Sequence, residues 1–568
     1  MIDTPSFNLI DKPWIEVRWL DGHTSVESLL TVFTNAGNIE EIVGELPTQA
    51  FAILRMLLAI LQRAIVSADT FDATVYPDEA WSRLWAADEL PMGELSAYLQ
   101  HWWKRFYLLG GEAPFMQVAG LHTSKDEVNP ISKIVAEAPD GHPFFTVRSG
   151  LGLDTLSLAE AARWLVHVQA FDTAGIKSGV VGDPEVKGGK SYPIGTGWTG
   201  RLGGVWVAGD CLKATLLLNL HLGQPNNVDH WVSGSDLPAW ERPVAVPGDS
   251  NRLPSGQADL YTWQSRRVRL VAVDDVVTGV ILTNGDKLKP HNQFNLEPMS
   301  GWRRSPNQEK ALKLPEVYLP FRVEAGRAMW RGLDAVLPDV ESRSLDGPAY
   351  RSPGVVSWVK HLASEEVGLL PSDFTINLRS VGIVYGPHES TVAEVISDQL
   401  LVKAALLTPA GGELVALAKD CVADTANGVR QIGSFARNLY LAEGGDSQAT
   451  DGPRDQATST AYYELDIMFR RWLADLVPVG GDEDMQSAHA AARREAWRTT
   501  ARGILTSLAE ALTAQTGPQA FTGHANNDAK VPWLTSAVAM RLFHGGLRKA
   551  LPLATDHPTN TPTERKTL

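Results

Sequence analysis

Residues 175–204, GIKSGVVGDPEVKGGKSYPIGTGWTGRLGG, combine ten glycines with four basic residues, Lys177, Lys187, Lys190 and Arg201, and only two acidic ones. Each glycine costs backbone entropy on folding, so this density predicts a backbone that closely approaches a ligand. The ligand group would be a phosphate, a sugar or a base. The alternative is a flexible surface insertion with no ligand.

Two nucleotide-binding patterns fit this segment only in part. Gly195 to Gly200 spells G-x-G-x-x-G, but the sequence around it predicts neither the preceding strand nor the helix that a dinucleotide site needs. Gly189-Lys190-Ser191 resembles the end of a phosphate-binding P-loop, but Pro184 occupies the position of its first glycine. What remains is a long, mildly basic loop with exposed amides.

No set of residues predicts catalysis or metal binding. Cys211 and Cys421 are far apart and belong to no Cys/His cluster, which argues against a structural zinc site or a disulfide framework. The chain has no G-x-S-x-G or H-E-x-x-H motif, and its fourteen histidines are scattered. We therefore expect no catalytic residue, no metal and no cofactor. A hydrolase-like enzyme that uses the glycine segment as an active-site lid stays open, because two carboxylates could meet across the fold.

Composition limits the partners of the chain. Its 568 residues suffice for two to four domains, and its formal net charge is −15. Nonspecific nucleic-acid binders are normally basic, so any such contact must be local or shared with basic partners. Eighteen tryptophans predict several aromatic contact surfaces. The N-terminus has no signal-peptide pattern, and the apolar run 51–66 carries Arg55, so we expect a buried helix and a cytoplasmic protein without a membrane contact.

The N-terminal two thirds of the chain mix strand and helix patterns. Residues 9–22 predict a strand and turn, and Thr24-x-x-Glu27 predicts a helix capping box. Helices are predicted at 47–66, 94–108 and 154–171, the last with an aspartate cap. A strand is predicted within 205–220, and β-structure over 266–291 with a hairpin turn at Asn284-Gly285. The last elements of this part are a strand from 374, a turn at 386–388 and a helix that begins at a second capping box, Thr391-x-x-Glu394.

From about residue 391 the pattern becomes helical. Five stretches, 391–407, 412–443, 457–476, 487–514 and 534–551, are separated by short polar links, which is typical of an antiparallel helical bundle. We therefore expect an α+β fold: a mixed α/β domain over 1–390, a helical bundle over 391–555 and a disordered tail over 556–568. Arg494, Arg498 and Arg502 share one helical face, which favours phosphate contacts, with a merely solvated face as the alternative.

Three stretches in order resemble the CasA family, the large subunit of the type I-E CRISPR surveillance complex called Cascade. They are LIDKPWIEVRW near the N-terminus, FYLLGGEAPFMQV at 106–118, and the glycine segment leading into LKATLLLNL. The resemblance covers nearly the whole chain and lies in the order and spacing of the motifs. It implies an N-terminal mixed α/β domain followed by a C-terminal four-helix bundle.

The resemblance also implies a function. CasA proteins inspect double-stranded DNA for the protospacer-adjacent motif (PAM) from the minor-groove side, with a glycine loop, a lysine finger and a wedge. Glycines lack the β-carbon that would keep a backbone away from this narrow groove. The glycine loop aligns best with Gly195, Gly197 and Gly200, and the lysine finger with Lys287 or Lys289, for which ordinary surface lysines are the alternative.

Two further family elements align with this chain. The wedge falls on His388 and Glu389, where related proteins have glutamine at the position of Glu389; a plain strand-to-helix turn is the alternative. A loop that contacts the PAM region matches 142–154, with Phe145, Thr146 and Arg148 as the expected contacts, unless the phenylalanine anchors the loop in the core.

The partners that the resemblance implies are double-stranded target DNA, the CRISPR RNA-containing subunits of Cascade, and the type I helicase-nuclease. The chain would then be a DNA-recognition subunit that helps to open the duplex and offers the helicase-nuclease a docking surface. Sequence specificity beyond the PAM would come from pairing with the guide RNA.

Overall fold

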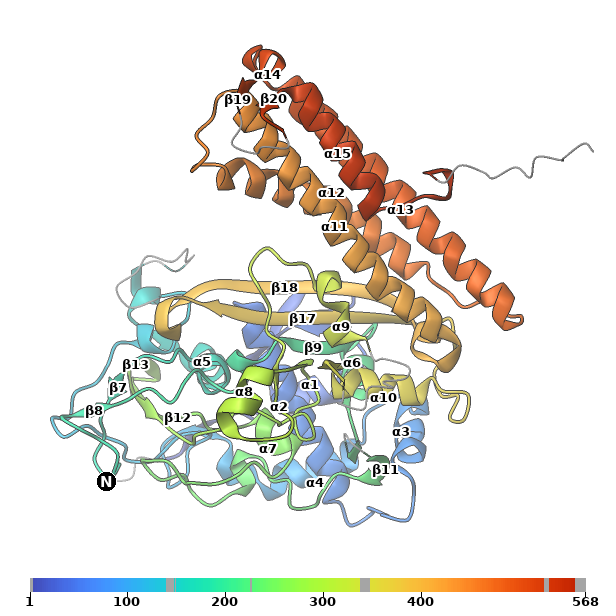
Figure 1. Cartoon of the computed structure of the whole chain (residues 1–568). Coiled ribbons are helices and arrows are strands. Elements are labelled where there is room, and N and C mark those ends of the chain that lie inside the picture. The colour runs from blue at the N-terminus through green and yellow to red at the C-terminus, as the bar shows by residue number, and fades with distance from the viewer. Residues whose placement is uncertain are drawn as a thin grey trace, which may run out of the picture. The chain divides into compact units, whose positions relative to one another are not determined.

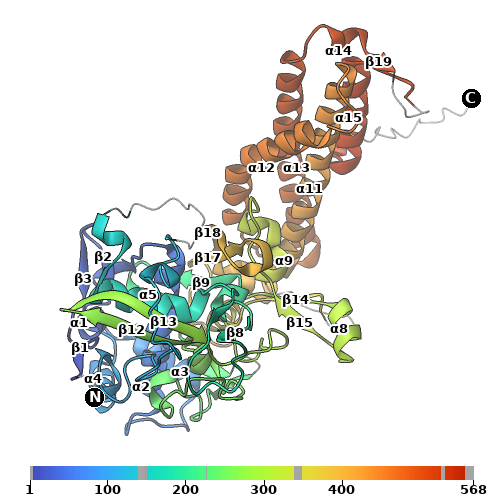
Figure 2. The same cartoon turned by 90° about the vertical axis from the view of Figure 1, so that its left-hand side faces the viewer.

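The computed structural model describes residues 4–138, 148, 150–224, 227–337, 348–525 and 531–556 (Figures 1 and 2). The chain forms two compact units. The first comprises the described residues within 1–329, 334–371 and 376–399, and the second those within 330–333, 372–375 and 400–568. The division in the C-terminal part falls at Gln399, inside a strand, rather than at residue 391.

The first unit mixes short sheets with helices. Its helices are α1 (Leu29–Thr34), α2 (Pro47–Val66), α3 (Pro77–Ala86), α4 (Met92–His101), α5 (Leu158–Phe171), α6 (Leu212–Asn219), α7 (Gln257–Tyr261), α8 (Pro306–Leu312) and α10 (Gly354–Leu362). Its three-stranded sheets have the orders β3-β2-β4, β12-β13-β6, β15-β14-β16 and β18-β17-β9. These strands are β2 (Ile15–Trp19), β3 (Thr24–Glu27), β4 (Ile39–Ile42), β6 (Leu156–Ser157), β9 (Gly204–Ala208), β12 (Arg266–Val273), β13 (Val276–Asn284), β14 (Trp302–Arg304), β15 (Tyr318–Pro320), β16 (Tyr350–Arg351), β17 (Thr375–Tyr385) and β18 (Val392–Lys403). Two-stranded sheets pair β1 (Ser6–Asn8) with β5 (Tyr107–Leu109) and β10 (Gly223–Gln224) with β11 (Asn227–Trp231).

Helix α2 is the core helix of this unit, which confirms the predicted buried helix. By length and composition alone it could cross a membrane, but 83% of its most apolar window is buried inside the protein. It packs against α4, α5, α6 and α7. The polar residues that interrupt its apolar run have buried partners: Gln62 donates to Asp236, and Arg63 pairs with Glu241.

Arg55, in the middle of α2, forms a fully buried ion pair with Glu297. The two guanidinium nitrogens Nη1 and Nη2 lie 2.7 and 2.8 Å from the carboxylate oxygens, and both side chains are 0% exposed. Trp198 also donates its indole N–H to Glu297, at 2.7 Å. A buried charge is tolerated only when it is paired and hydrogen-bonded, so this cluster fixes the position of Trp198 within the glycine segment.

The predicted helix at 391–407 is wrong, because residues 392–403 form strand β18, which pairs with β17 (Figure 1). The Thr391-x-x-Glu394 spacing fits a capping box, but Val392, Val395 and Ile396 are β-branched and favour a strand when a partner strand is available. Pairing with the predicted strand β17 therefore overrides the local helix signal.

The predicted hairpin turn at Asn284-Gly285 is also misplaced. The hairpin β12–β13 turns at Asp274 and Asp275, whose φ angles are 49° and 61°. Two consecutive residues with positive φ are what a type I′ turn requires, and aspartate tolerates this conformation. Asn284 instead ends β13, and its side-chain amide donates to Ser191 Oγ and Tyr192 O at 3.0 and 2.7 Å.

Four other local predictions were partly wrong. Thr24–Glu27 is a strand, and Ser28 caps α1 by accepting from the amide of Thr31. Helix α5 begins after Ser157, which forms a capping box with Glu160, so no aspartate caps it. Helix α4 ends at His101, and the strand predicted within 205–220 ends at Ala208, where the chain turns into α6.

The second unit is built on long helices, as predicted. Helix α11 (Gly412–Ala442) packs against α12 (Asp451–Ala474), α13 (Glu483–Ala514) and α15 (Ser536–Ala550), which lie alongside it in Figure 2. Short α14 (Gln519–Thr522) and the strand pair β19 (His524–Ala525) and β20 (Trp533–Leu534) lie between α13 and α15 in sequence. Helix and strand together, with helices at the C-terminus, confirm the α+β class.

Many of the tryptophans are core residues rather than contact surfaces. Among the largest fully buried side chains of the described residues are those of Trp14, Trp81, Trp164, Trp198, Trp240, Trp302, Trp330, Trp358 and Trp497. Large aromatic rings bury much apolar surface each, so they stabilise cores as readily as interfaces. The tryptophan count alone therefore does not locate a binding surface.

Candidate nucleic-acid interface

The exposed part of the glycine segment is a hairpin between β7 (Lys177–Ser178) and β8 (Lys190–Ser191). At its tip, Gly188 and Gly189 have φ angles of 58° and 73°, and a β-carbon on either would meet nothing within 4 Å. The neighbouring Lys187 and Lys190 are exposed, and neither forms an ion pair with the part of the chain that the structure describes. The tip therefore presents open backbone flanked by two lysines.

The three glycines of GTGWTG lie deeper. A β-carbon on Gly195 would collide with the guanidinium of Arg201, one on Gly200 with the hydroxyl of Tyr385, and one on Gly197 would lie 2.5 Å from the carbonyl oxygen of Ala170. These glycines therefore allow close packing of the segment on the C-terminal end of α5 and on β17. Their predicted approach to a minor groove stays a prediction, and the structure supplies a packing reason for each of them.

Arg266 binds the chain on both sides of the glycine hairpin. Its Nη2 donates to the carbonyl oxygens of Thr173 and Gly195 at 2.9 and 2.8 Å, and its Nε pairs with Asp172. Lys177 also pairs with Asp172, at 2.6 Å. Burial opposes ionisation of Asp172, but the adjacent Lys177 and Arg266 hold its pKa below the usual value, so the cluster stays charged.

The turn expected to act as a wedge has an unusual backbone. His388 and Glu389 both lie in the left-handed region, with φ angles of 56° and 54°. Such a conformation costs of order 1–3 kcal/mol for a non-glycine residue and persists only where the surroundings hold it. The imidazole of His388 is exposed, so the turn projects this ring outward from β17 and β18.

Several contacts hold this turn in place, two of them with residues just before the glycine segment. The amide of Ala174 donates to the carbonyl oxygen of Glu389 at 2.8 Å, and the hydroxyl of Tyr385 donates to the carbonyl oxygen of Phe171 at 2.7 Å. The Glu389 carboxylate accepts from Arg322 at 2.7 Å. Burial raises the pKa of Tyr385, so this phenol remains a hydrogen-bond donor.

The two candidate finger lysines differ in their surroundings. The ammonium of Lys287 lies 2.5 Å from the carboxylate of Glu185 in the glycine hairpin and 3.7 Å from Asp249. These carboxylates raise the pKa of Lys287, chiefly through the hydrogen bond with Glu185. Lys289 is exposed and forms no ion pair with the described residues. Neither lysine is on a hairpin tip, because the hairpin turn lies at Asp274 and Asp275.

Of the predicted loop contacts, Phe145 and Thr146 lie outside the described residues. Arg148 is nearly buried and pairs with Glu45, with further carboxylates of Glu137 and Glu160 at 3.9 and 3.5 Å. In this arrangement the guanidinium of Arg148 is paired with carboxylates of the protein itself, and its contact with DNA stays a prediction.

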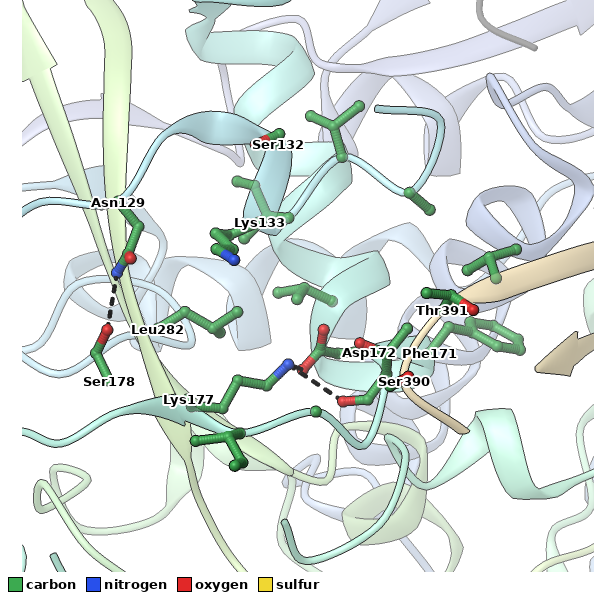
Figure 3. Close-up of a pocket in the computed structure, with 18 of the residues that line it drawn as sticks. Asn129, Ser132, Lys133, Phe171, Asp172, Lys177, Ser178, Leu282, Ser390 and Thr391 are labelled. Carbon is green, nitrogen blue, oxygen red and sulfur yellow. Dashed lines mark hydrogen bonds and ion pairs between the residues drawn. The ribbon is translucent and has the colours of Figure 1, made fainter. Parts of the chain in front are cut away.

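A cavity of about 470 Å³ lies between the glycine hairpin, the end of α5, residues 129–136 and the turn at Gly386–Ser390, here called the wedge turn (Figure 3). Figure 3 shows Asn129 and Lys133 across the cavity from Ser390 and Thr391. Lys133, Lys177 and Lys190 line it, and Asp172 is the one carboxylate among its described lining residues. The cavity thus joins the two segments that the sequence singled out separately.

The arginines predicted to contact phosphate in the second unit have carboxylate partners. Arg494 and Arg498 pair with Asp424 at 3.1 and 2.8 Å, and Arg502 pairs with Asp556 at 2.5 Å. Their shared helical face is therefore a surface that ties α13 to α11 and to the segment after α15. Binding of phosphate by this face stays a prediction.

Three residues of this region, Arg322, Tyr385 and Lys133, were not predicted from the sequence. Arg322 and Tyr385 carry no motif, and only the folded chain brings them to the wedge turn. Lys133 likewise gave no signal. The tip residues Gly189 and Lys190 did give one, the truncated P-loop pattern, which indicated exposed amides beside a lysine without identifying the ligand.

Comparison with known proteins identifies the family. The family model described as CRISPR-associated protein Cse1 matches residues 8–508. The crystal structure of Thermobifida fusca Cse1 superposes with a TM-score of 0.84 and is 40% identical, covering 97% of this chain and 99% of that one. The CRISPR-associated protein CasA/Cse1 of Thermus thermophilus is 26% identical over 541 residues, 91% of this chain and 96% of its own length.

The same fold occurs in an assembled complex. A chain of a structure described as a CRISPR RNA-guided surveillance complex superposes with a TM-score of 0.64 at 18% identity, covering 90% of this chain and 99% of that one. At this identity the likeness concerns the fold. The family model and the sequence relatives, which span nearly the whole chain, show that it belongs to the CasA/Cse1 family of CRISPR-associated proteins.

Proposed function

We propose that this chain is the DNA-recognition subunit of a type I-E CRISPR surveillance complex, in which it recognises the PAM from the minor groove and helps to open the duplex. Membership of the CasA/Cse1 family and the occurrence of the fold in a surveillance complex support the assignment. In this assignment the C-terminal helices are the four-helix bundle of the family.

The observation that carries the proposal is the contact between two elements that lie far apart in the sequence. Glu389 of the wedge turn (Gly386–Ser390) accepts a hydrogen bond from Ala174, the residue before the glycine segment, and Gly200 of that segment packs on Tyr385, the residue before the turn. A device that holds the PAM and separates the adjacent base pair needs these two functions side by side, because unstacking costs a few kcal/mol that PAM contacts must offset.

Local charge supports DNA binding by an acidic protein. The hairpin tip carries Lys187 and Lys190, and the segment 287–289 adds two more lysines nearby in the fold, since Lys287 reaches Glu185 on the hairpin. A lysine donates to thymine O2 or adenine N3 without requiring one base, which suits tolerance of several PAMs. Because the net charge of the chain is −15, the remaining attraction would come from partner subunits.

The roles of the individual residues follow from their exposure. His388 and the backbone of the wedge turn would enter the duplex, and Lys289 or Lys287 would contact the PAM. Gly188 and Gly189 at the hairpin tip have backbone that is open to an approaching groove, while Gly195, Gly197 and Gly200 allow the close packing that positions the segment. The proposed function also includes a docking surface for the type I helicase-nuclease. We assign this docking to the assembled complex and not to particular residues of this chain.

The proposal is tested by reconstitution of the complex with and without this chain. We expect the complete complex to prefer a PAM-bearing duplex over a PAM-less one, and to make thymines beside the PAM reactive to permanganate. A complex without the chain should lose both properties. Equal affinity for both duplexes with the chain present would contradict the proposed function.

A further inference from the structure

The 470 Å³ cavity lies within the size range of sites for small ligands, roughly 300–1,000 Å³. It opens at the surface of the first unit, at the base of the glycine hairpin. All the elements that form it belong to this unit: residues 129–136, the C-terminal end of α5, the hairpin strands, β13 and the start of β18. Its shape therefore does not depend on the second unit.

One wall of the cavity is apolar. Its accessible apolar surface comes from Ile176, which is 57% exposed, and from the partly buried Val392, whereas Phe171 and Leu282 also line the cavity but are only 1% and 2% exposed. An exposed isoleucine at a cavity mouth offers a surface against which a flat, weakly polar group can pack. The face of a nucleobase is such a group, because bases stack on apolar and aromatic side chains when they leave the duplex.

The other wall offers hydrogen bonds and positive charge. Asn129, Ser178, Ser390 and Thr391 supply amide and hydroxyl groups that can match the edge of a base. Lys190 stands at the rim on the exposed hairpin. The one carboxylate, Asp172, is neutralised by Lys177 and Arg266, so the local charge favours an anion such as the phosphate of the same nucleotide.

The cavity also adjoins the strained turn. Ser390 and Thr391, which line it, directly follow His388 and Glu389, the two residues with left-handed backbone. A nucleotide displaced from the stack by that turn would leave the duplex next to the cavity mouth.

We infer that this cavity receives a single nucleotide extruded from the DNA duplex beside the PAM, with its base against Ile176 and Val392 and its phosphate near Lys190. The inference rests on the proposed function and adds to it a binding site for one displaced nucleotide. In this mechanism capture of the displaced nucleotide keeps the first base pair from closing again, so opening of the duplex is a two-part event of wedging and capture.

Gly175 allows the cavity to be filled without a clash. It lines the cavity, its backbone conformation suits any residue, and a β-carbon there meets nothing within 4 Å. Gly175→Trp should therefore occupy the cavity while the fold is kept. Gly175→Ala is the matched small substitution at the same position. Gly93→Trp, at an exposed glycine of α4 that also has open space around it, controls for a bulky surface residue.

The assembled complex containing CRISPR RNA is mixed with a PAM duplex that carries 2-aminopurine beside the PAM, and opening is followed by stopped-flow fluorescence. We expect Gly175→Trp to slow opening at least tenfold, while Gly175→Ala and Gly93→Trp stay within twofold of the unmodified complex. Thermal melting of each variant confirms that the fold is intact.

An abasic nucleotide identifies the captured group. An abasic nucleotide at the extruded position has no base to place in the cavity. The Gly175→Trp complex and the unmodified complex should therefore open this duplex at equal rates. A tenfold defect that persists on the abasic duplex would show that the tryptophan obstructs the backbone or the groove, and it would overturn the inference.

Failure of the inference can be distinguished from failure of the proposed function. If the unmodified complex does not prefer PAM-bearing DNA, the proposed function fails. If it prefers and opens this DNA, and Gly175→Trp does so at the same rate, the proposed function stands and the cavity does not receive a nucleotide.

Discussion

The amide of Ala174 donates a 2.8 Å hydrogen bond to the carbonyl oxygen of Glu389, and this contact joins two segments more than two hundred residues apart in sequence. One ends directly before the glycine segment, and the other is the turn at His388 and Glu389 that we propose as the wedge. Because the bond uses backbone atoms, it fixes the path of the turn while leaving the exposed side chain of His388 available for other contacts and that of Glu389 to pair with Arg322.

Replacement of Glu389 by glutamine should strengthen binding to a PAM duplex severalfold at low salt. The substitution removes a negative charge near the phosphates and releases Arg322 from its ion pair. Both side chains are more than a third exposed, so stability should change by no more than about 1 kcal/mol. The dissociation constant as a function of salt concentration measures the effect. Glu79→Gln, which breaks an exposed pair with Arg83, should leave affinity unchanged, and weaker binding by Glu389→Gln would contradict the expected repulsion.

Replacement of Gly197 by alanine should destabilise the first unit by about 1–3 kcal/mol, the usual cost of overpacking. The new β-carbon would lie 2.5 Å from the carbonyl oxygen of Ala170. Urea unfolding of the chain measures the change. Gly175→Ala is the control, because its β-carbon has open space around it. Equal stability of the two variants, with a binding defect only for Gly197→Ala, would favour a direct approach of Gly197 to the DNA.

Lys287 should contribute to PAM binding only after it leaves Glu185. Lys287→Ala should therefore weaken binding of a PAM-bearing duplex more than binding of a PAM-less one, whereas Glu185→Gln should strengthen binding by removing the competing carboxylate. Lys289→Ala provides the comparison with a lysine that has no ion pair with the described residues. Gel-shift titration on both duplexes measures the effect, and equal losses on both would make these lysines general phosphate contacts.

Simultaneous replacement of Arg494, Arg498 and Arg502 by alanine should lower the free energy of unfolding of the second unit by on the order of 1–3 kcal/mol, because Asp424 loses both of its arginine partners. Arg437→Ala, at an exposed arginine that forms no ion pair with the described residues, should have little effect. If the arginines also bind phosphates, the slope of log K against log salt should fall by about one unit for each phosphate that is no longer neutralised. An unchanged slope with reduced stability would limit the three arginines to a structural role.

Stability of the first unit should fall as the pH is lowered below about 6.5. Burial lowers the pKa of His167 to about 3, although the charge of Asp172 opposes the shift, and in the unfolded chain its pKa is about 6.5. Between these values the unfolded chain binds a proton that the folded chain does not. His167 therefore destabilises the fold by about 1.4 kcal/mol for each pH unit below 6.5, and this loss is absent above that pH.

Urea unfolding at pH 5 and pH 7 tests this expectation. His167→Gln removes the titrating group and should reduce the difference in stability between the two pH values. His122→Gln, at an exposed histidine, should leave the difference as it is in the unmodified protein. An equal pH dependence in both variants would assign the acid sensitivity to other groups.

The sequence by itself determined the elements whose signals are local. The apolar run of α2, the long amphipathic helices after residue 412 and strand β17 could all be predicted, because hydrophobic periodicity decides such elements. The order of the motifs also pointed to the correct family. Tertiary pairing decided the segments whose local signals were ambiguous: residues 392–403 became β18 because β17 lies beside them, although their spacing fits a helix cap.

Only the tertiary structure decided which residues of the candidate site meet. The sequence marks Gly197 and Gly188 alike, but the first is buried against α5 and the second is exposed at a hairpin tip. Arg494 and its neighbours have the pattern of a phosphate-binding face, yet their partner Asp424 lies on another helix. Contacts between residues distant in sequence depend on how elements pack, and packing leaves no short pattern in the chain, so the cavity beside the wedge turn could be found only in the folded protein.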